Sequence, residues 1–554
     1  MINFVKGRFL ALALAAPLLA SSARANVYAT DIKFNGAEPL VTGANFGTIK
    51  ISYILNEPAT LGVTATISLG ASQIRALTAL PGAQGTLFGR NVLVWDGNDS
   101  SGNPAPTGFY VVTITAASSG HGGWTQISQD TNAGNYVSDP RGLAVDNNSN
   151  SLYYGRVFVG NASTGPRYTN TPGDQITILK LNADGTFADE GPDGNGGYAY
   201  MVDSGDEGVP QKMRVGEDDR LYMMNLDQRE LVAFDMLLST NQVVLSPGNY
   251  SENPYWLDGS IPGGLGWYSM DVTGANTTNG LIWLGQADAG GAGIWNWPLT
   301  NGVADPNDNI GAWVVGVGDS LGEAASGGLM VDANFDLFVG QYLTDTGDTN
   351  ADCMEFTNWN HGLSSGGEPV TNGAAWSAGG GDDTFLGVED VTIDSRQHPQ
   401  YVACALNGGP VTGGVRILDA ATGARVAANL DATNQYYVTA WDGVGNLYAA
   451  SGTSHRLRVF APPAGTNQMT TSGSLQIESA ITRITLRGSV LTITFVASAS
   501  DKPDEFTLQS CATVNGAYEV VSGAVPVQTS PGAFTVTTTA TEIVQFYRIS
   551  KTGG

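Results

Sequence analysis

Apolar and polar residues alternate in one phrase that recurs six times between Leu143 and Ala450. Each copy has an apolar residue, usually followed by Asp, then a short polar turn and an apolar or aromatic pair, as in MVDANFDLFVG and AWDGVGNLYAAS. Such a phrase predicts two short strands joined by a tight turn. The apolar residues that anchor the six copies are Val145, Val215, Met270, Val331, Ile393 and Trp441. Successive anchors are 48 to 70 residues apart, so the chain repeats a strand–turn–strand unit.

A second apolar pattern follows each anchor phrase and supplies outer strands, for example ITILKLNADGTF after the first and RLRVFAPP after the last. Repeats of this length, built from short strands, are typical of a β-propeller. Six anchors with six partners predict six blades over residues 121–470. The last blade is one strand short, and we expect WTQIS (Trp124 to Ser128) to complete it and close the ring.

Two stretches carry a family resemblance. The phrase DPRGLAVD from Asp139 to Asp146 and the turn Gly445-Asn-Leu-Tyr448 resemble NHL-type propeller repeats, although the second and third copies lack the usual Gly and Asp. The resemblance implies a six-bladed, NHL-like propeller. It leaves the activity open, because six-bladed propellers include calcium lactonases, lyases, sugar-binding proteins and plain scaffolds.

Residues 26–120, ahead of the ring, alternate apolar and polar positions in ISYIL and FYVVTITA, which predicts a β-sandwich. The run VLVWDGNDSSGNPAPTGFYVVTITA resembles the Ig-like domain of the flagellar hook-capping protein, which is widespread in secreted bacterial proteins. The resemblance implies that Trp95 packs near the loop and that Gly108 opens the last strand. It implies no flagellar role, since such sandwiches are reused as spacers. We expect Asp96, Asn98 and Asp99 to cap a tight turn rather than to bind a cation.

Residues 471–554 form the third predicted unit, after an expected linker at 465–473 that is rich in Gly, Thr, Ser and Asn. Runs such as RITLRGSVLTITFVA and AFTVTTTA predict a small antiparallel sandwich. The ending from Gln545 to Ile549 resembles the last strand of a fibronectin-like module found at the ends of large exported bacterial proteins. The predicted fold class is therefore all-β, with a propeller between two sandwiches.

Residues 1–25 have the layout of a secretory signal peptide. Lys6 and Arg8 are basic, residues 9–20 are apolar, and Ala23-Arg24-Ala25 is a small-x-small cleavage site. The apolar run is too short to cross a bilayer, and no later stretch is long enough. We therefore expect a secreted protein, periplasmic or extracellular, whose mature chain begins at Asn26 and is not inserted in a membrane.

The charge balance narrows the range of partners. The chain has 51 Asp and Glu against 25 Lys and Arg, a net charge of -26. Such a surface repels phosphate backbones and anionic lipids, which argues against nucleic acid and membranes as partners. Only three Cys occur, and we expect Cys353 and Cys404 to be buried thiols rather than a disulfide.

Candidate ligand-binding residues lie just before the anchors, where a propeller opens its central channel. The most notable of them are Asp139, Arg141, Lys212, Tyr268, Glu389 and Asp390. Two adjacent carboxylates beside basic and aromatic residues are compatible with a cation site, an acid–base pair or a sugar-binding surface. A solvated polar channel without a specific ligand is the competing interpretation.

A second candidate site is the acidic stretch with Asp348, Asn350 and Asp352, whose alternate oxygen side chains imitate the first ligands of a calcium loop. However, Cys353 stands where an EF-hand requires Gly, and Trp359 stands where it requires the bidentate Glu. An ordinary acidic loop is the alternative. Ca²⁺ is the only cofactor that the sequence brings into consideration, and no residue is assigned a catalytic role.

Many Trp residues fall in long connections between the second and fifth repeats, where aromatic rings suit carbohydrate, although blade interfaces also use Trp. No nucleophile elbow, phosphate loop or dinucleotide motif is present in the sequence. We therefore expect a binding protein of the bacterial cell envelope that uses the propeller as a platform for carbohydrate or protein at the cell surface. The alternatives are a divalent-cation hydrolase or lyase at the channel mouth, and a structural spacer of a surface layer.

Overall fold

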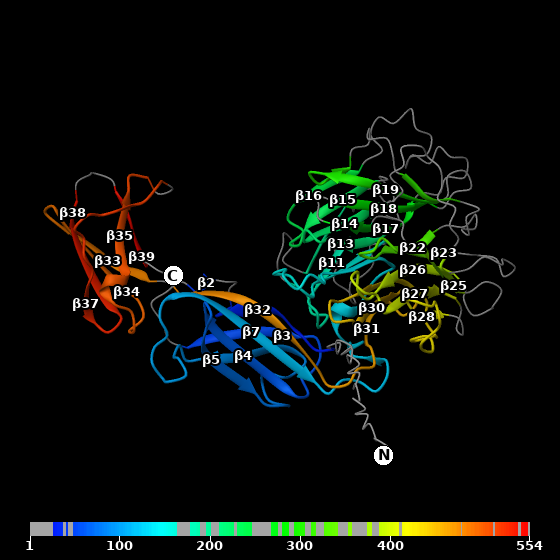
Figure 1. The fold of residues 1–554 in the computed structure, drawn as a ribbon, viewed down its shortest axis with the longest axis horizontal. Coiled ribbons are helices and arrows are strands. Elements are labelled where there is room, and N and C mark those ends of the chain that lie inside the picture. The colour runs from blue at the N-terminus through cyan, green and yellow to red at the C-terminus, as the bar shows by residue number, and fades with distance from the viewer. Residues whose placement is uncertain are drawn as a thin grey trace, which may run out of the picture.

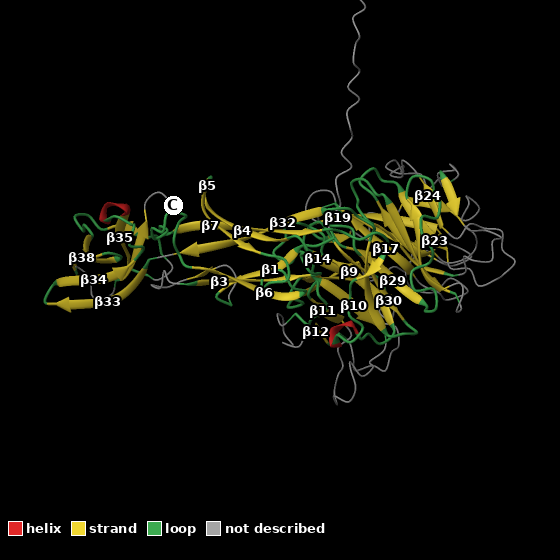
Figure 2. Ribbon diagram, turned by 90° about the horizontal axis from the view of Figure 1, so that it is seen from below, coloured by secondary structure: helices red, strands yellow, loops and turns green. Residues whose placement is uncertain are grey.

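The described part of the chain is all-β. The computed structural model describes residues 26–36, 40–41, 48–162, 178–188, 196–200, 210–225, 230–245, 267–274, 280–286, 293–304, 312–316, 326–341, 353–356, 374–378, 387–408, 413–477, 479–513, 516–540 and 545–551. Helix is limited there to two 3-10 turns, η1 (Ala133–Asn135) and η4 (Pro503–Glu505). No helix among these residues is long and apolar enough to cross a membrane. The strands gather in three bodies in a row, with the smallest at the C-terminal end (Figures 1 and 2).

Two facing sheets form the middle body, which contains the N-terminal strands. One sheet has the order β1 (Ala29–Phe34), β3 (Ile49–Leu55), β6 (Gly89–Trp95), and the other has the order β2 (Leu40–Val41), β32 (Asn467–Ile477), β7 (Gly108–Ser118), β4 (Gly62–Leu69), β5 (Ser72–Ala79). The core between them includes fully buried Trp95, which packs edge-on against Tyr110 and donates from Nε1 to the Asn98 carbonyl at 2.8 Å. In the same loop, Asp99 Oδ1 accepts the backbone N–H groups of residues 101 and 103, so this carboxylate caps a turn as expected.

Strand β32 corrects the expected linker. Residues 467–477 form a full antiparallel partner of β7, from Asn467 opposite Ser118 to Ile477 opposite Gly108. The Thr, Ser and Gly content suggested a linker, but Asn467, Thr471, Leu475 and Ile477 are buried along this strand. The linker prediction is wrong there, and residues 471–477 belong to the middle sandwich rather than to a C-terminal unit. The ring is consequently inserted between two neighbouring strands of one sheet.

In the described part of the chain, six antiparallel sheets lie between β7 and β32 and form the ring (Figure 1). In chain order they are β9 (Pro140–Val145), β10 (Val157–Asn161), β11 (Ile178–Leu181), β12 (Gly197–Tyr198); β13 (Met213–Val215), β14 (Arg220–Asn225), β15 (Glu230–Asp235), β16 (Asn241–Leu245); β17 (Trp267–Thr273), β18 (Leu281–Gln286), β19 (Gly293–Thr300), β20 (Val303–Ala304), β21 (Ala312–Gly316); β22 (Ser326–Val331), β23 (Leu337–Gln341), β24 (Cys353–Phe356), β25 (Trp376–Ala378); β26 (Val388–Ile393), β27 (Tyr401–Asn407), β28 (Gly413–Asp419); and β29 (Tyr436–Trp441), β30 (Leu447–Ser451), β31 (Arg456–Ala461), β8 (Thr125–Gln126). Each predicted anchor lies on a different one of the strands β9, β13, β17, β22, β26 and β29, which we call the inner strands. Consecutive inner strands contact one another, and β29 contacts β9, so the described sheets close in the manner of a β-propeller.

Apolar clusters fill the spaces between neighbouring sheets. On β10, Val157 and Val159 face the last sheet while Phe158 faces the second, because alternate residues of a strand point to opposite sides. Similar clusters join the remaining neighbours around the ring. Cys353 and Cys404 are buried in the same apolar cluster and form no disulfide, as expected. Because both faces of each sheet are buried in this way, the strands of the repeats are rich in apolar residues.

The Asp that follows several anchors has a role in the turn. Asp332 Oδ1 accepts the backbone N–H groups two and four residues further on, at 2.8 Å each. Asp442 Oδ1 accepts the equivalent N–H groups at 3.1 and 2.8 Å. Asp146 accepts the N–H two residues on at 3.0 Å. Such local bonds are the usual reason for Asp in tight turns. Burial raises the pKa of both Asp146 and Asp442 to about 6.

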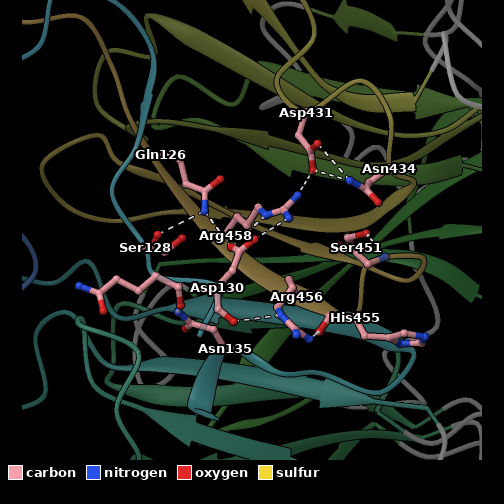
Figure 3. Close-up of polar contacts among 12 residues, drawn as sticks. Gln126, Ser128, Asp130, Asn135, Asp431, Asn434, Ser451, His455, Arg456 and Arg458 are labelled. Atoms are coloured by element: carbon pink, nitrogen blue, oxygen red, sulfur yellow. Dashed lines mark hydrogen bonds and ion pairs between the residues drawn. The ribbon is translucent and has the colours of Figure 1, made fainter. Parts of the chain in front are cut away.

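Strand β8 closes the ring in the predicted way. Thr125 and Gln126 pair with Ala461 and Phe460 of β31, so the start of this body supplies the outer strand of the last sheet. Arg458 on β31 lies between Asp130 and Asp431 and bonds to both (Figure 3). These ion pairs fasten the segment after β8 to the last sheet, which protects a sheet edge.

The C-terminal body is a small sandwich with two sheets. Their orders are β33 (Ala480–Arg487), β34 (Val490–Val496), β38 (Ala533–Thr539), β37 (Val527–Ser530), and β36 (Glu519–Val520), β35 (Phe506–Cys511), β39 (Phe546–Lys551). Its joint with the middle sandwich centres on buried Asp501, which accepts the Thr107 hydroxyl at 3.0 Å and pairs with Lys551 at 2.8 Å. Lys551 also donates to the Thr107 carbonyl, so three side chains fix this joint.

Candidate functional site

The starts of the inner strands meet at one end of the ring, which we call the mouth. Lys212, just before β13, reaches Glu389 on β26, and Arg141 on β9 stacks on Tyr437 on β29. The opposite end of the first and last sheets packs on the middle sandwich, where the Tyr28 hydroxyl lies 3.4 Å from that of Tyr448. The mouth therefore faces away from the sandwich.

A buried ion-pair network crosses the centre of the ring. Arg396, in the turn after β26, binds Asp271 on β17 through two nitrogens at 2.7 and 2.8 Å. Asp271 Oδ2 also accepts the Val331 backbone N–H at 2.8 Å, and Asp271 is fully buried. Arg214 on β13 lies between this pair and Asp390, with Nε 3.8 Å from Asp271 Oδ1 and Nη2 3.3 Å from Asp390 Oδ1. The ion pairs link β13, β17 and β26, and the Val331 N–H adds β22, so the network favours one arrangement of the ring.

Asp390 is fully buried, and both of its oxygens have partners. Oδ1 faces Arg214 at 3.3 Å and Lys212 Nζ at 3.5 Å, while Oδ2 accepts the Thr439 backbone N–H at 3.0 Å. The chain's own cations thus take the positions around this carboxylate that an added cation would need. Within the described residues, no group of three or more His, Cys, Asp and Glu side chains is arranged to hold a metal ion.

Lys212 and Glu389 lie together at the inner edge of the mouth. Lys212 Nζ donates to the Glu389 carbonyl oxygen at 2.5 Å, and Glu389 Oε1 accepts from Asn407 Nδ2 at 2.7 Å. Burial lowers the pKa of Lys212, although the carboxylates of Asp390 and Glu389 oppose that shift. Burial also raises the pKa of Glu389. Both pKa shifts favour the uncharged forms, Lys212 as an amine and Glu389 as a carboxylic acid.

Arg141 and Asp139 form the outer, solvent-facing part of the mouth. The Arg141 guanidinium carbon lies 4.4 Å above the centre of the Tyr437 ring, and Nε is 3.2 Å from Asp139 Oδ1. The Arg141 and Asp139 side chains are 32% and 37% exposed. Asp139 has a φ of 45°, a left-handed conformation that Asp tolerates better than most residues. Stacking and the ion pair hold donor and acceptor groups side by side at the surface.

Five of the nine predicted site residues thus gather at the mouth, namely Asp139, Arg141, Lys212, Glu389 and Asp390. Tyr268 lies on β17, but its side chain is outside the described part of the structure. The possible calcium ligands Asp348, Asn350 and Asp352 also lie outside the described residues.

Three residues of the ion-pair network were not predicted from the sequence: Arg214, Asp271 and Arg396. In the third repeat Asp271 stands between the anchor Met270 and the predicted turn, and β17 continues to Thr273 and leaves Asp271 on the strand. Arg214 immediately precedes an anchor, which was a usable signal for a position near the channel. Arg396 lies in the turn after its anchor. Nothing in the local sequence indicates that its side chain reaches Asp271 at the centre of the ring.

Comparisons with known proteins do not assign the chain to a family. No family model matches it, and no curated protein matches it. Among solved structures 56 chains match, one of which belongs to a crystal structure of a nidogen/laminin complex. That match has a TM-score of 0.29 and 9% sequence identity, and it covers 53% of this chain and 81% of the other. A TM-score this low carries no argument about the fold or the function of this chain.

Proposed function

We propose that this chain is an exported binding protein in which a six-bladed, NHL-like propeller presents its mouth to carbohydrate or protein at the cell surface. Six sheets with one anchor each, joined through their inner strands, support the blade count. The middle body then serves as an Ig-like spacer, and the C-terminal body is a fibronectin-like module.

One observation carries the binding role: the polar groups of the ring form two sets. Those at its centre are buried and paired, whereas Arg141 and Asp139 form a partly exposed rim of the mouth. Asp271 and Asp390 have Arg, Lys and backbone partners, so they stabilise the platform. Arg141 and Asp139 are held in place yet remain about one third exposed. A rigid surface of this kind loses little conformational entropy when it binds a ligand.

The rim favours a ligand rich in hydroxyl groups. Arg141 supplies donors, Asp139 supplies acceptors, and a hydroxyl group is both donor and acceptor. The Tyr437 ring beneath Arg141 holds the guanidinium in place by cation–π stacking, so its donors are presented in a fixed orientation. The net charge of -26 disfavours polyanionic polymers, so neutral glycans are the first class to test.

The test is a glycan array followed by titration of the best neutral oligosaccharide on the array. The double variant Arg141→Ala/Tyr437→Ala should lose at least about tenfold in affinity, the scale of losing one or two well-placed contacts. A matched control exists in the C-terminal body, where Arg548 stacks on Tyr518 at 4.5 Å. The variant Arg548→Ala/Tyr518→Ala should bind like the parent. Binding that both double variants retain would rule out the rim as the site.

A second candidate function is acid–base chemistry on a sugar or lactone by Glu389 and Lys212. Their opposite pKa shifts favour it, because such shifts gather at catalytic sites. The test is hydrolase and lyase assays with and without Ca²⁺. Activity that Glu389→Gln abolishes while the folded state is retained would support an enzyme. A calcium-dependent rise in melting temperature that Glu389→Gln/Asp390→Asn removes would place the ion at the mouth.

Export is part of the proposal. Residues 1–25 carry the predicted leader, and Ala23-Arg24-Ala25 supplies the small-x-small pattern that signal peptidases cleave. Expression of the full chain in an exporting bacterial host, followed by N-terminal sequencing of the exported protein, tests this step. The expected first residue is Asn26.

A further inference from the structure

Asn26 is completely buried at the junction of the middle sandwich and the ring. Its backbone N–H donates to Asn467 Oδ1 at 3.0 Å, and its carbonyl accepts from Asn56 at 2.8 Å and from Asn446 at 3.0 Å. Its side chain donates to the Pro462 carbonyl at 3.2 Å and accepts from Asn467 Nδ2 at 2.9 Å. Every polar group of this one residue is therefore bound.

The partners of Asn26 come from both bodies. Asn56 follows strand β3 of the sandwich, and Asn467 begins β32. Asn446 lies in the turn between β29 and β30 of the ring, and residue 462 follows β31 where the chain leaves it. Asn26 thus connects the sandwich with the last sheet of the ring and with the connection between them.

The same junction contains acceptors that are not fully used. Among the described residues, Glu57 Oε1 and Asn446 Oδ1 are buried without a hydrogen-bond partner. Glu57 is next to Asn56, and its other oxygen lies 2.8 Å from His121 Nε2. Asn446 donates to Asp442 Oδ2 at 2.7 Å, and Asp442 is fully buried. The unused acceptors are thus one carboxylate oxygen, of Glu57, and one amide oxygen, of Asn446. Together with the buried carboxylate of Asp442 they favour a positively charged donor nearby.

We propose that the junction is a binding site for the free α-ammonium group of Asn26, produced by cleavage after Ala25, and that this group locks the ring onto the sandwich. The inference rests on the export step proposed above. A signal-peptide-cleaving protease adds water across the amide bond between Ala25 and Asn26. The Ala25 carbonyl becomes a carboxylate, and the Asn26 nitrogen becomes an amine that takes up a proton.

Cleavage changes what Asn26 offers to the junction. An amide nitrogen has one hydrogen to donate, and Asn467 Oδ1 accepts it. An α-ammonium has three hydrogens and a positive charge, and an α-amino group is mostly protonated at neutral pH. The additional donors match the unused acceptors of Glu57 and Asn446, and the charge offsets the buried carboxylates of Glu57 and Asp442.

The experiment compares three forms of the full mature protein. One begins at Asn26, one carries Gly-Ser before Asn26, and the control carries Gly-Ser after Gly554 instead. The α-amine of the first form should react with an acylating reagent at least about tenfold more slowly when folded than when unfolded, since burial requires a local opening. The Gly-Ser extension before Asn26 should lower the melting temperature by about 2 °C or more, and the control extension should not.

A charge-specific readout separates an ammonium site from simple packing. Glu57→Gln should lower the melting temperature more in the chain that begins at Asn26 than in the chain extended before Asn26. Comparing the two backgrounds removes the contribution of the His121 contact, which both chains share. Equal losses, or an α-amine that reacts as fast folded as unfolded, would overturn the site even if export occurs as proposed. An exported chain whose first residue is not Asn26 would overturn the processing step, whereas the reactivity assay judges the site independently.

Discussion

Arg458 Nη2 lies 2.7 Å from Asp130 Oδ2 and joins the last long strand of the ring to the segment that precedes the first inner strand (Figure 3). The two residues are 328 positions apart in sequence. Asp431 binds the same guanidinium, and Arg456 donates from Nε to the Asp130 carbonyl at 3.1 Å. The ring is thus closed by side-chain contacts as well as by strand pairing.

The Arg458–Asp130 pair should contribute to stability in a pH-dependent way. The hydrogen bond from Arg458 lowers the pKa of Asp130. A lowered folded-state pKa stabilises the protein above the ordinary Asp pKa of about 3.9 and loses that effect as the pH falls through the lowered value. Because the Asp130 side chain is 41% exposed, Asp130→Asn should cost only about 1 kcal/mol at pH 7.

The measurement is urea unfolding of parent and variant at pH 7 and near pH 3. The difference between them should shrink at the lower pH. Asp504→Asn, at an exposed position in η4, is the matched control and should behave like the parent at both values. A cost for Asp130→Asn that is the same at both pH values would contradict this explanation.

The central pair of Asp271 and Arg396 should be much more costly to break. Asp271→Ala leaves the Arg396 guanidinium without its two carboxylate bonds, and breaking one partner of a buried pair costs about 3 to 5 kcal/mol. The double change Asp271→Leu/Arg396→Met should cost less than the single change, because no charge then stays unpaired. Denaturant unfolding of the three proteins checks the order, and a double variant less stable than Asp271→Ala would refute it.

The inner strands were predictable because burial between sheets leaves an apolar pattern in the local sequence. Val331 and Ile393 are anchors that are almost fully buried on such strands. The closing strand was predictable as well, since the last repeat lacked a partner and Trp124 to Ser128 was available. By contrast, β32 was missed because its outward positions are Thr, Ser and Gln, which resemble a linker when the strand partner is unknown.

The buried ion-pair network at the centre of the ring could not be predicted from the local sequence. Arg214 and Asp390 are 176 residues apart, so neither indicates the other in the local sequence. The adjacent carboxylates Glu389 and Asp390 suggested a shared cation site, yet they point to different partners: Glu389 accepts from Asn407, while Asp390 faces Arg214. Alternation along a strand separates neighbouring side chains, and only the closure of the ring determines what each one meets.

The buried turn aspartates should make the ring less stable at neutral pH than near pH 4. Burial raises the pKa of Asp146 to about 6. A raised folded-state pKa means that the folded protein holds the proton between the ordinary pKa of about 3.9 and that value, so stability falls as the pH rises through this window. The charged carboxylate then costs about 2 to 3 kcal/mol by pH 7, the equivalent of a shift of about two pKa units.

Asp146→Asn removes this titration but keeps an oxygen for the backbone N–H of Asn148. The variant should be as stable as the parent near pH 4 and more stable at pH 7. Unfolding free energies at pH 4, 5, 6 and 7 check the slope, with Asp504→Asn as the control that should keep the parent's slope. A variant whose pH profile parallels that of the parent would show that Asp146 stays ionised throughout.

The middle sandwich should not fold from residues 26–118 alone. Strand β32 pairs with β7 over eleven positions, and its Leu475 and Ile477 belong to the buried core. A fragment that ends at Ser118 leaves β7 without one neighbour and uncovers that core, whereas a sandwich normally needs all strands of both sheets to bury its apolar face. Since Ser118 and Asn467 are opposite each other, a two-residue Asn-Gly turn between them should replace the whole ring.

We expect the fragment 26–118 to give poorly dispersed amide NMR spectra and no cooperative thermal transition. The fusion of 26–118, Asn-Gly and 467–477 should give a dispersed spectrum and a cooperative transition. In the fusion, Asn467 is also present to receive Asn26, although Asn446 of the ring is not. A fragment 26–118 that folds as stably as the fusion would show that β32 docks on a finished domain, and the ring would then follow the sandwich in the chain instead of being inserted in it.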